Sequence, residues 1–478
     1  MTGSSLYCES IMSLAKQIRQ GELSPVELTE HYLQRIQALD GRLNAFRLVC
    51  ADKALADAKV AEQMLHSGND LGVLHGIPYA VKDLFDVAGL PTSAGTHLLE
   101  KNIAQHNSTA VDKLSQAGMI LLGKTNTVQF AYGGVGLNHD HGTPHNPWHA
   151  AHHVPGGSSS GSGVAVAAGM VPMALGTDTG GSVRIPASLC GVVGLKTTVG
   201  QVNRAGVYPL SQTLDTVGPL TKTAADAAHV YQWLQGPDPD PYEPVGLATQ
   251  DVISDLAQGA NGLHVAFAET TFWDDVNPEV EKAVRACGAV FTELGAKVSS
   301  IEFPHAAQAL TFNPRGLALA AEAYTNNRKW IEDHFDELDP VVGSRLMVGK
   351  DVGAVEYLQC LMDWRVLRGE ALEALQGVDA LLVPATITPA MPLTEIDINS
   401  DKYKRYNLAY LRNTVIGNIL NFCGLVMPCG FTESGLPIGL MIYGKPFAED
   451  IVLRLGYGFQ QATDWHLKTP DLSFVMAS

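Results

Sequence analysis

The sequence predicts an α/β fold in which one large domain contains a central mixed β-sheet flanked by helices. Segments of strand character alternate with segments of helical periodicity along the chain, which is typical of this fold class. Hydrophobic residues make up 46% of the 478 residues, enough for a large buried core. Length alone suggests about three domains. Large α/β enzymes often form a single unit, however, and we expect one domain over residues 1–478.

The first third of the chain begins with helices. Ser24-Pro25-Val26-Glu27 is a capping box with proline at the first helical position, and apolar residues then recur at helical spacing as far as Gly41. The next elements expected are a helix at 51–65, a strand at 77–82 that ends in Lys82, a helix at 109–117 and a strand at 119–123.

The same alternation continues to the end of the chain. The further strands expected lie at 171–176, 263–268, 298–303, 380–383, 425–427 and 438–443. The further helices expected lie at 162–169, 278–294, 355–375 and 449–461. The proline-rich segment Gly236–Pro244 is the clearest loop and is expected to cross the domain surface. Residues of about 305–375 look helical, and a helical cap over the site is a possible arrangement.

Charge and cysteine content exclude several classes of function. The net charge is −17, and an acidic surface repels both phosphate backbones and anionic lipids, so we expect no nucleic-acid or membrane partner. The seven cysteines are scattered without a CxxC pair, which is typical of a reduced, cytoplasmic protein. We find no signal peptide, and the longest apolar run, Val164–Leu175, is too short to cross a bilayer.

Three motifs resemble functional sites but lack the context that those sites need. Gly118–Thr125 has the letters of a phosphate-binding loop, but its middle is itself strand-like. Gly157–Gly161 has the letters of a nucleophile elbow around Ser159, but no strand pattern precedes it. The third is a histidine-rich stretch in which Pro144 and Pro147 prevent a helix. We expect a solvated loop there, with adventitious zinc or nickel binding as the alternative; its histidines are His139, His141, His145, His149, His152 and His153.

Two Gly/Ser-rich loops are the strongest functional signal. They are Gly156–Gly163 and Gly180–Ser182, joined by the mostly apolar run Val164–Thr179. Ser182 follows a predicted strand, and the glycines before it let successive N–H groups converge as an oxyanion hole requires. Serine is a weak nucleophile and needs a base. No histidine has an obvious place for that role, and Lys82, at the end of a predicted strand, is the alternative base. The other interpretation of Lys82 is an ordinary lysine exposed on a loop.

Nine segments, in order, resemble the amidase signature family of serine hydrolases. These segments cover nearly the whole chain, with a core at about 70–220. They are Gly76–Asp83, Gly123–Asn126, Asn146-Pro147, Pro155–Ser162, Gly176–Pro186, Cys190-Gly191, Gly194–Lys196, Leu214–Pro219 and Gly435–Leu440.

The resemblance implies a Ser-Ser-Lys triad. By position, Lys82 matches the family's base, Ser158 its bridging serine after a cis peptide bond, and Ser182 its nucleophile. The backbone N–H groups of Thr179, Gly180, Gly181 and Ser182 would form the oxyanion hole. Asp178, Arg184 and Ser159 would support the loops. No metal or other cofactor is implied.

Four positions depart from the common family pattern: Gln129, Ser160, Gly163 and Thr197. The first two could alter the pocket or its supports, which leaves the substrate open. Our main hypothesis is a free amidase, hydrolysing a bulky, apolar amide, anilide or carbamate, with the region around Phe312, Leu317 and Leu319 as a cap.

The alternative hypothesis is the amidase subunit of a tRNA-dependent amidotransferase, which supplies ammonia to a partner. Such a subunit should bind the carboxylate of glutamine, and Arg315 is the lone candidate for that task in the apolar stretch 305–325. For the free amidase we expect a small-molecule substrate as the partner and count a homodimer among the possible assemblies.

Overall fold

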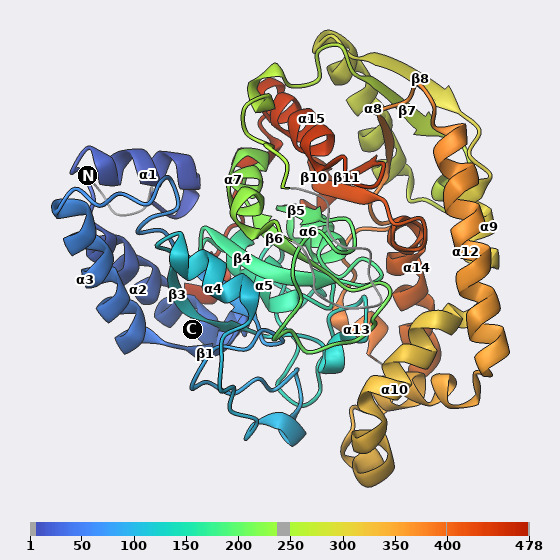
Figure 1. Cartoon of the computed structure of the whole chain (residues 1–478), viewed down its shortest axis with the longest axis horizontal. Coiled ribbons are helices and arrows are strands. Elements are labelled where there is room, and N and C mark those ends of the chain that lie inside the picture. Colours follow the sequence, from blue (N-terminus) through green and yellow to red (C-terminus); the bar gives the residue numbers. More distant parts are fainter. Residues whose placement is uncertain (1–5, 237–248, 398, 477–478) are drawn as a thin grey trace.

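The computed structural model describes residues 6–236, 249–397 and 399–476. Within them, eleven strands form one mixed sheet. The strand order is β1-β3-β2-β4-β6-β5-β10-β11-β9-β7-β8. Helices cover the sheet, and the fold is the single-domain α/β arrangement predicted (Figure 1). The strands are β1 (Phe46–Val49), β2 (Pro78–Lys82), β3 (Ile120–Thr125), β4 (Met173–Asp178), β5 (Val193–Lys196), β6 (Thr216–Thr221), β7 (His264–Ala268), β8 (Lys297–Ile301), β9 (Ala380–Pro384), β10 (Cys423–Phe431) and β11 (Pro437–Gly444).

The central strands are buried on both faces, which explains their continuous apolar runs. β2 lies between β3 and β4 and runs parallel to both, while β4 pairs antiparallel with β6. All residues of β2, β3 and β4 are buried. The carboxyl ends of β2 and β4 therefore lie at the same edge of the sheet, where Lys82 and Asp178 end their strands.

All the predicted helices are present, with ends shifted by a few residues at most. The capping box is confirmed, because Ser24 Oγ accepts from the Glu27 N–H and the Glu27 carboxylate accepts from the Ser24 N–H. The α-helices are α1 (Ile11–Arg19), α2 (Pro25–Leu43), α3 (Ala51–His66), α4 (Thr109–Gln116), α5 (Ser160–Ala167), α6 (Arg184–Cys190), α7 (Ala224–Leu234), α8 (Pro278–Glu293), α9 (His305–Thr311), α10 (Leu317–His334), α11 (Pro340–Leu346), α12 (Ala354–Ala374), α13 (Leu393–Ile396), α14 (Ser400–Ile419), α15 (Glu449–Ala462) and α16 (Ser473–Met476).

Residues 305–375 are helical, as predicted, and include α9 to α12 at one side of the molecule (Figure 1). Side chains of α10 and α11 pack with the loop Val128–Tyr132 in a small apolar cluster of their own. Leu317, in contrast, is buried in the main core, and Phe312 packs against that core. The predicted loop Gly236–Pro244 lies outside the described residues apart from Gly236.

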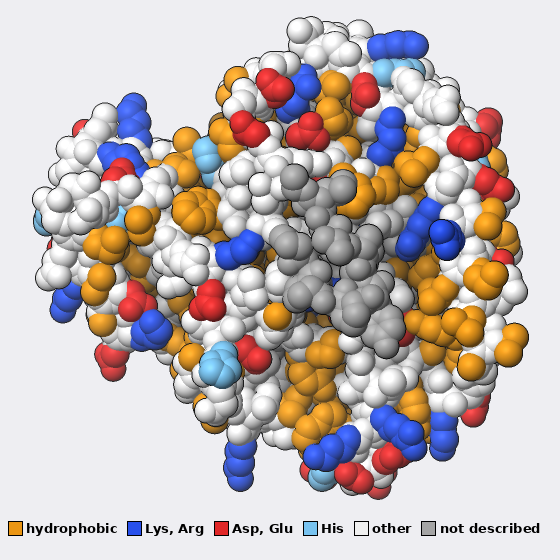
Figure 2. Space-filling view, viewed as in Figure 1, with side chains coloured by type: hydrophobic (Ala, Val, Ile, Leu, Met, Phe, Trp, Pro, Cys, Tyr) orange, Lys and Arg blue, Asp and Glu red, His pale blue; other side chains and the backbone are white. Residues whose placement is uncertain are grey.

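One face of α12 exposes a row of apolar side chains. Val355, Leu358, Met362 and Val366 recur at helical spacing and are 83%, 57%, 63% and 63% exposed. Figure 2 shows apolar side chains along the edge of the molecule where Figure 1 places α12. Contiguous exposed apolar surface of this kind is typical of contact sites.

All seven cysteines are free, and five of them are buried. Burial raises the pKa of the Cys190 thiol, which makes it unreactive. Within the described part of the chain, no helix combines the length and the hydrophobicity needed to span a membrane.

The histidine-rich stretch is a loop, but the prediction that it is solvated is wrong for two of its members. His145 and His153 are only 5% and 7% exposed. The rings of His145 and His152 stack with their centroids 4.5 Å apart. His139 contacts two carboxylates, with Nδ1 2.7 Å from Asp339 and Nε2 3.1 Å from Asp397.

His139 gives a prediction about stability and pH. The hydrogen bond to Asp339 raises the pKa of His139 to about 9, above its ordinary value of 6.5. Its stabilising contribution is therefore complete below about pH 6.5 and is lost as pH rises through about 9. Because the ring is 36% exposed, we expect His139→Gln to cost only ~1 kcal/mol at pH 6 and nothing at pH 10. Thermal denaturation at both pH values measures this, and equal losses at the two would contradict it.

Candidate active site

Lys82 is buried at the end of β2 and contacts two hydroxyl groups. Its Nζ donates to Ser158 Oγ at 2.7 Å and to Thr177 Oγ1 at 2.8 Å. Sequence reasoning had singled out Lys82 and Ser158 but missed Thr177. That residue gave no local signal, because it lies in a buried apolar strand, one residue before Asp178.

Burial changes the protonation of this lysine. Lys82 is fully buried, and the loss of water around it lowers the pKa of its amine to about 7, although Asp215 and Asp178 pull the pKa upward. An ordinary lysine has a pKa of 10.5. Near pH 7, a large fraction of Lys82 is therefore neutral and able to accept a proton.

Ser158 is held by its backbone as well as by Lys82. The Gly157–Ser158 peptide bond is cis, as the resemblance implied. The carbonyl of Ser158 accepts from Thr127 Oγ1 at 2.9 Å and from the Val128 N–H at 3.3 Å. These contacts hold the backbone of Ser158, and its Oγ accepts from Lys82.

Ser182 lies in the loop between β4 and α6 and is 4% exposed. Its carbonyl accepts from the Ser159 N–H at 3.2 Å, which joins the two Gly/Ser-rich loops directly. Among the described residues, the Ser182 hydroxyl has no hydrogen-bond partner. The structure thus brings Lys82 and Ser158 into hydrogen-bond contact and places Ser182 on the adjoining loop, with its hydroxyl free for a substrate.

One of the four N–H groups predicted for the oxyanion hole has an acceptor within its own loop. The Gly181 N–H donates to Asp178 Oδ1 at 2.9 Å, so this amide is engaged within the loop. The N–H groups of Thr179, Gly180 and Ser182 have no acceptor among the described residues. Of the N–H groups predicted for the oxyanion hole, these three are therefore without an acceptor in the described part of the chain, and Gly181 lies in the same loop.

Asp178 and Arg184 brace the loop through a buried ion pair. Arg184 Nε and Nη2 each lie 2.9 Å from an oxygen of Asp178, and neither side chain is exposed. Burial by itself raises the pKa of Asp178, but the Arg184 guanidinium outweighs this and holds the pKa well below its usual range. The pair stays charged at all working pH values.

Two residues far along the chain complete this brace, and sequence reasoning missed both. Asn418 Nδ2 donates to Asp178 Oδ1 at 2.9 Å, and Arg184 Nη1 donates to the Tyr443 hydroxyl at 2.8 Å. Ser159 supports the other side, because its hydroxyl donates to the Thr177 carbonyl at 3.3 Å.

Helix α14 packs against the outer side of the Ser182 loop. Thr414 Oγ1 donates to the Gly180 carbonyl at 2.6 Å. Leu411 and Val415 lie beside Gly180, with side-chain carbons 3.4 and 4.0 Å from where a Cβ would be. This helix was not among the predicted elements, so sequence reasoning missed the apolar side chains next to the site.

A methyl group at Gly181 is expected to disrupt the loop. Gly181 has φ +133°, and a Cβ there would lie 2.2 Å from Thr414 Oγ1. Because a distorted loop would displace the N–H groups of Gly180 and Ser182, we expect Gly181→Ala to lower kcat at least ~10²-fold, the order found when an oxyanion donor is lost. Gly435→Ala is the matched control, because Gly435 also has positive φ (+83°) but nothing lies within 4 Å of its Cβ position. Full activity of Gly181→Ala in a steady-state assay would contradict the role of this loop.

The two decoy motifs have the structures that their context predicted. Ile120–Thr125 is strand β3, and Lys124 pairs with Asp83 at 2.6 Å, so Gly118–Thr125 is no phosphate loop. Helix α5 begins at Ser160, and His149–Pro155 contains no strand.

Three of the four departures from the family pattern have different surroundings. Gln129 is buried and bridges two regions: its Nε2 donates to Asp140 at 3.2 Å, and its Oε1 accepts from the Asp339 N–H at 3.0 Å. Thr197 Oγ1 donates to the Val217 carbonyl at 3.0 Å. The buried hydroxyl of Ser160 has no partner among the described residues.

The chain is similar to known proteins along nearly its whole length. The family model described as Amidase matches residues 27–453. The chain is 38% identical to the Glu-tRNA(Gln) amidotransferase A subunit of Chromohalobacter salexigens, over 99% of this chain and 100% of that protein. It is 36% identical to 2-amino-5-chloromuconic acid deaminase of Comamonas testosteroni, over 94% of this chain and 95% of that protein.

Solved structures with the same fold include amidases. The peptide amidase of Stenotrophomonas maltophilia is 30% identical with a TM-score of 0.80, covering 95% of this chain and 96% of that one. A structure reported as a vestigial protein complex, bearing on the origins of an s-triazine catabolic enzyme, has a TM-score of 0.87 at 31% identity, covering 95% and 98%. The fold and these matches define an enzyme that acts on C–N bonds. The chain belongs to the amidase signature family.

Proposed function

We propose that this enzyme hydrolyses the C–N bond of a linear amide through an acyl-enzyme on Ser182. The observation that carries the proposal is the buried hydrogen bond between Lys82 Nζ and Ser158 Oγ, 2.7 Å long, on the loop next to Ser182. A buried amine with a lowered pKa is matched to proton transfer near neutral pH.

The steps of the reaction follow from this arrangement. Neutral Lys82 accepts the proton of Ser158, Ser158 takes that of Ser182, and the Ser182 oxygen attacks the amide carbon. The N–H groups of Thr179, Gly180 and Ser182 stabilise the oxyanion, each worth about 3 kcal/mol in such sites. Ser158 returns a proton to the leaving nitrogen, the C–N bond breaks, and water then hydrolyses the ester to acid and free Ser182.

Two substrate assignments have support of different kinds. Amidotransferase A subunits match nearly the full chain at 38% and 35% identity. The relatives therefore support the ammonia-supplying subunit of an amidotransferase better than they support our main hypothesis, a free amidase for apolar amides. The exposed apolar row on α12 also suits a chain that docks a partner. Arg315, the predicted carboxylate ligand, has a side chain outside the described residues.

The free amidase has support from the site itself. Leu411 and Val415 present apolar carbons beside Gly180, where the substrate's acyl group would lie. The relatives also include a deaminase and a peptide amidase, whose names describe activities other than that of an amidotransferase. This assignment predicts turnover of anilides or carbamates without any partner.

One set of assays separates the two. Purified enzyme is incubated with glutamine, alone and with the B and C subunits of a bacterial amidotransferase, and with p-nitroanilides, aryl carbamates and short primary amides. Ammonia release from glutamine only in the complex supports the amidotransferase assignment. Turnover of anilides or carbamates by the chain alone supports the free amidase, and Ser182→Ala must abolish either activity. Turnover that survives in Ser182→Ala overturns the proposal itself.

A further inference from the structure

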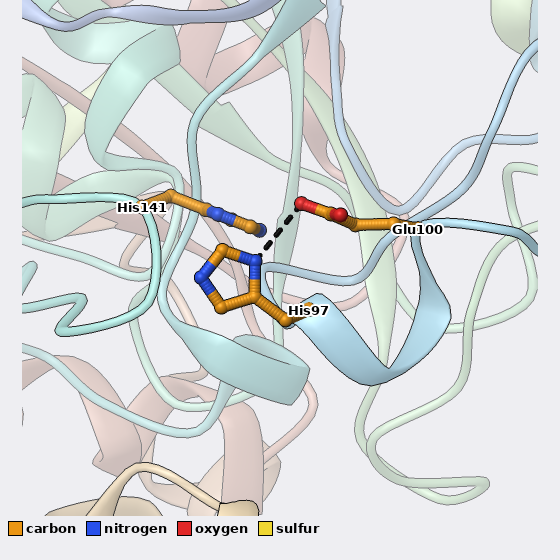
Figure 3. Close-up of side chains that lie close together, drawn as sticks. All are labelled: His97, Glu100 and His141. Atoms are coloured by element: carbon orange, nitrogen blue, oxygen red, sulfur yellow. Dashed lines mark hydrogen bonds and ion pairs between the residues drawn. The ribbon is translucent and has the colours of Figure 1, made fainter.

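Two histidines and a glutamate gather at the surface, outside the triad and its supports. His97 and Glu100 lie one turn apart on the 3₁₀ helix His97–Leu99 and its C-cap, and His141 approaches from the histidine-rich loop. One ligand atom from each lies within 4.8 Å of those of the other two. Figure 3 shows the Glu100 carboxylate facing the His97 ring, whose Nδ1 is 2.9 Å from Oε1, with the His141 ring beside both.

His141 gives this cluster a nitrogen without a partner. Its Nε2 atom is buried, although the ring is only half-buried, and it has no hydrogen-bond partner in the part of the chain that the structure describes. The backbone of His141 is held in place, because its N–H donates to Asn138 Oδ1 at 2.7 Å and its carbonyl accepts from Asn44 Nδ2 at 2.9 Å. The rings of His97 and His141 are perpendicular, at 89°, with centroids 4.6 Å apart.

We propose that His97, Glu100 and His141 form a binding site for a divalent transition-metal ion of the zinc type. Imidazole nitrogens and one carboxylate are the ligands that zinc takes in sites with three protein ligands, the remaining position being left to water. The Asp140 carboxylate, which accepts from the His97 N–H at 3.1 Å, adds a second negative charge near the ion.

Arg47 is the competitor for this site. Its Nη2 lies 2.5 Å from Glu100 Oε1, the oxygen that also contacts His97. Arg47 is 35% exposed, so it can turn towards solvent when a cation takes the carboxylate. Its removal should therefore strengthen metal binding, whereas removal of a ligand should weaken it.

The ion would join two loops that support the triad. Asn138, which holds His141, also donates to the Gly95 carbonyl at 2.9 Å and to the Thr127 carbonyl at 2.7 Å. Thr127 in turn donates to the carbonyl of Ser158. The metal would therefore stabilise the fold rather than take part in the reaction, and its binding should raise the thermal stability of the enzyme.

Titration of EDTA-dialysed, full-length enzyme with ZnCl₂ in a calorimeter tests the proposal. We expect one ion per chain, affinity at least tenfold lower in His97→Ser, Glu100→Gln and His141→Asn, and higher affinity in Arg47→Ala. His149→Asn is the matched control from the histidine-rich loop, and its affinity should equal that of the wild type.

Without metal, the three ligand variants should melt at the wild-type temperature, which shows that they are folded. Zn²⁺ should raise the melting temperature of the wild type and leave that of the three ligand variants unchanged. No saturable binding below about 100 μM, or equal binding by wild type and all three ligand variants, overturns the proposal. The second result would mean that zinc binds elsewhere in the histidine-rich loop.

Discussion

Ser182→Ala is expected to lower kcat by roughly 10⁴-fold or more, as loss of the nucleophile does in other serine hydrolases. The fold should be unchanged, because the Ser182 hydroxyl has no partner among the described residues, so its removal breaks no contact there. A fluorophosphonate probe gives a readout that does not depend on the natural substrate. The serine oxygen displaces fluoride, so the peptide that contains Ser182 should gain the mass of the probe less HF in the wild type, and no peptide should gain it in the variant.

Ser160→Ala is the control for this experiment. Ser160 is also buried, lies in the other Gly/Ser-rich loop and has a hydroxyl without a partner among the described residues. The variant should keep its activity and its labelling. Labelling of Ser182→Ala at the wild-type rate would show that the nucleophile is a different residue.

Lys82→Met is expected to lower kcat/KM roughly 10³-fold, the middle of the range for loss of a general base. The wild type should also show an acidic limb, because only neutral Lys82 accepts a proton and its pKa is about 7. Activity should fall about tenfold per pH unit below that value and be constant above it. The pH dependence of kcat/KM between pH 5 and 9 measures this limb.

Lys196→Met is the matched control. Lys196 is equally buried, and burial lowers its pKa to about 8, but its Nζ donates to the carbonyls of Thr197 and Phe422 rather than to a serine. Its replacement should leave the acidic limb near pH 7. An unchanged limb in Lys82→Met, or one that vanishes in Lys196→Met, would contradict the assignment of Lys82 as base.

The sequence predicted those elements whose apolar side chains are continuous or regularly spaced. The strands that became β2, β3 and β4 are fully buried apolar runs, and α2 has its capping box. β6 was missed because Gly218 and Pro219 are usually breakers of structure. These two residues are tolerated in the middle of a sheet only because of tertiary context that no local pattern contains.

Polar residues that are buried gave no signal of their own. The inner face of α14 carries Asn413, Thr414 and Asn418, all fully buried. Hydrophobic periodicity therefore fails for this helix, and the contacts of Thr414 and Asn418 to the Ser182 loop could not be predicted. Ser182 and Lys82 were candidates from the residues themselves, Ser158 came from the family resemblance, and only the structure adds Thr177 as the second hydroxyl on Lys82.

The brace around Asp178 also determines when the enzyme can first become active. Asp178 and Gly180 are held by Asn418 and Thr414, and Arg184 by Tyr443, across sequence separations of 240, 234 and 259 residues. Contacts this distant form late, because the chain between them must first be closed into a loop. A growing chain that ends before residue 400 has Lys82, Ser158 and Ser182 but lacks helix α14, which contacts the Ser182 loop. Catalytic competence should thus be among the last properties that this protein acquires as it is made.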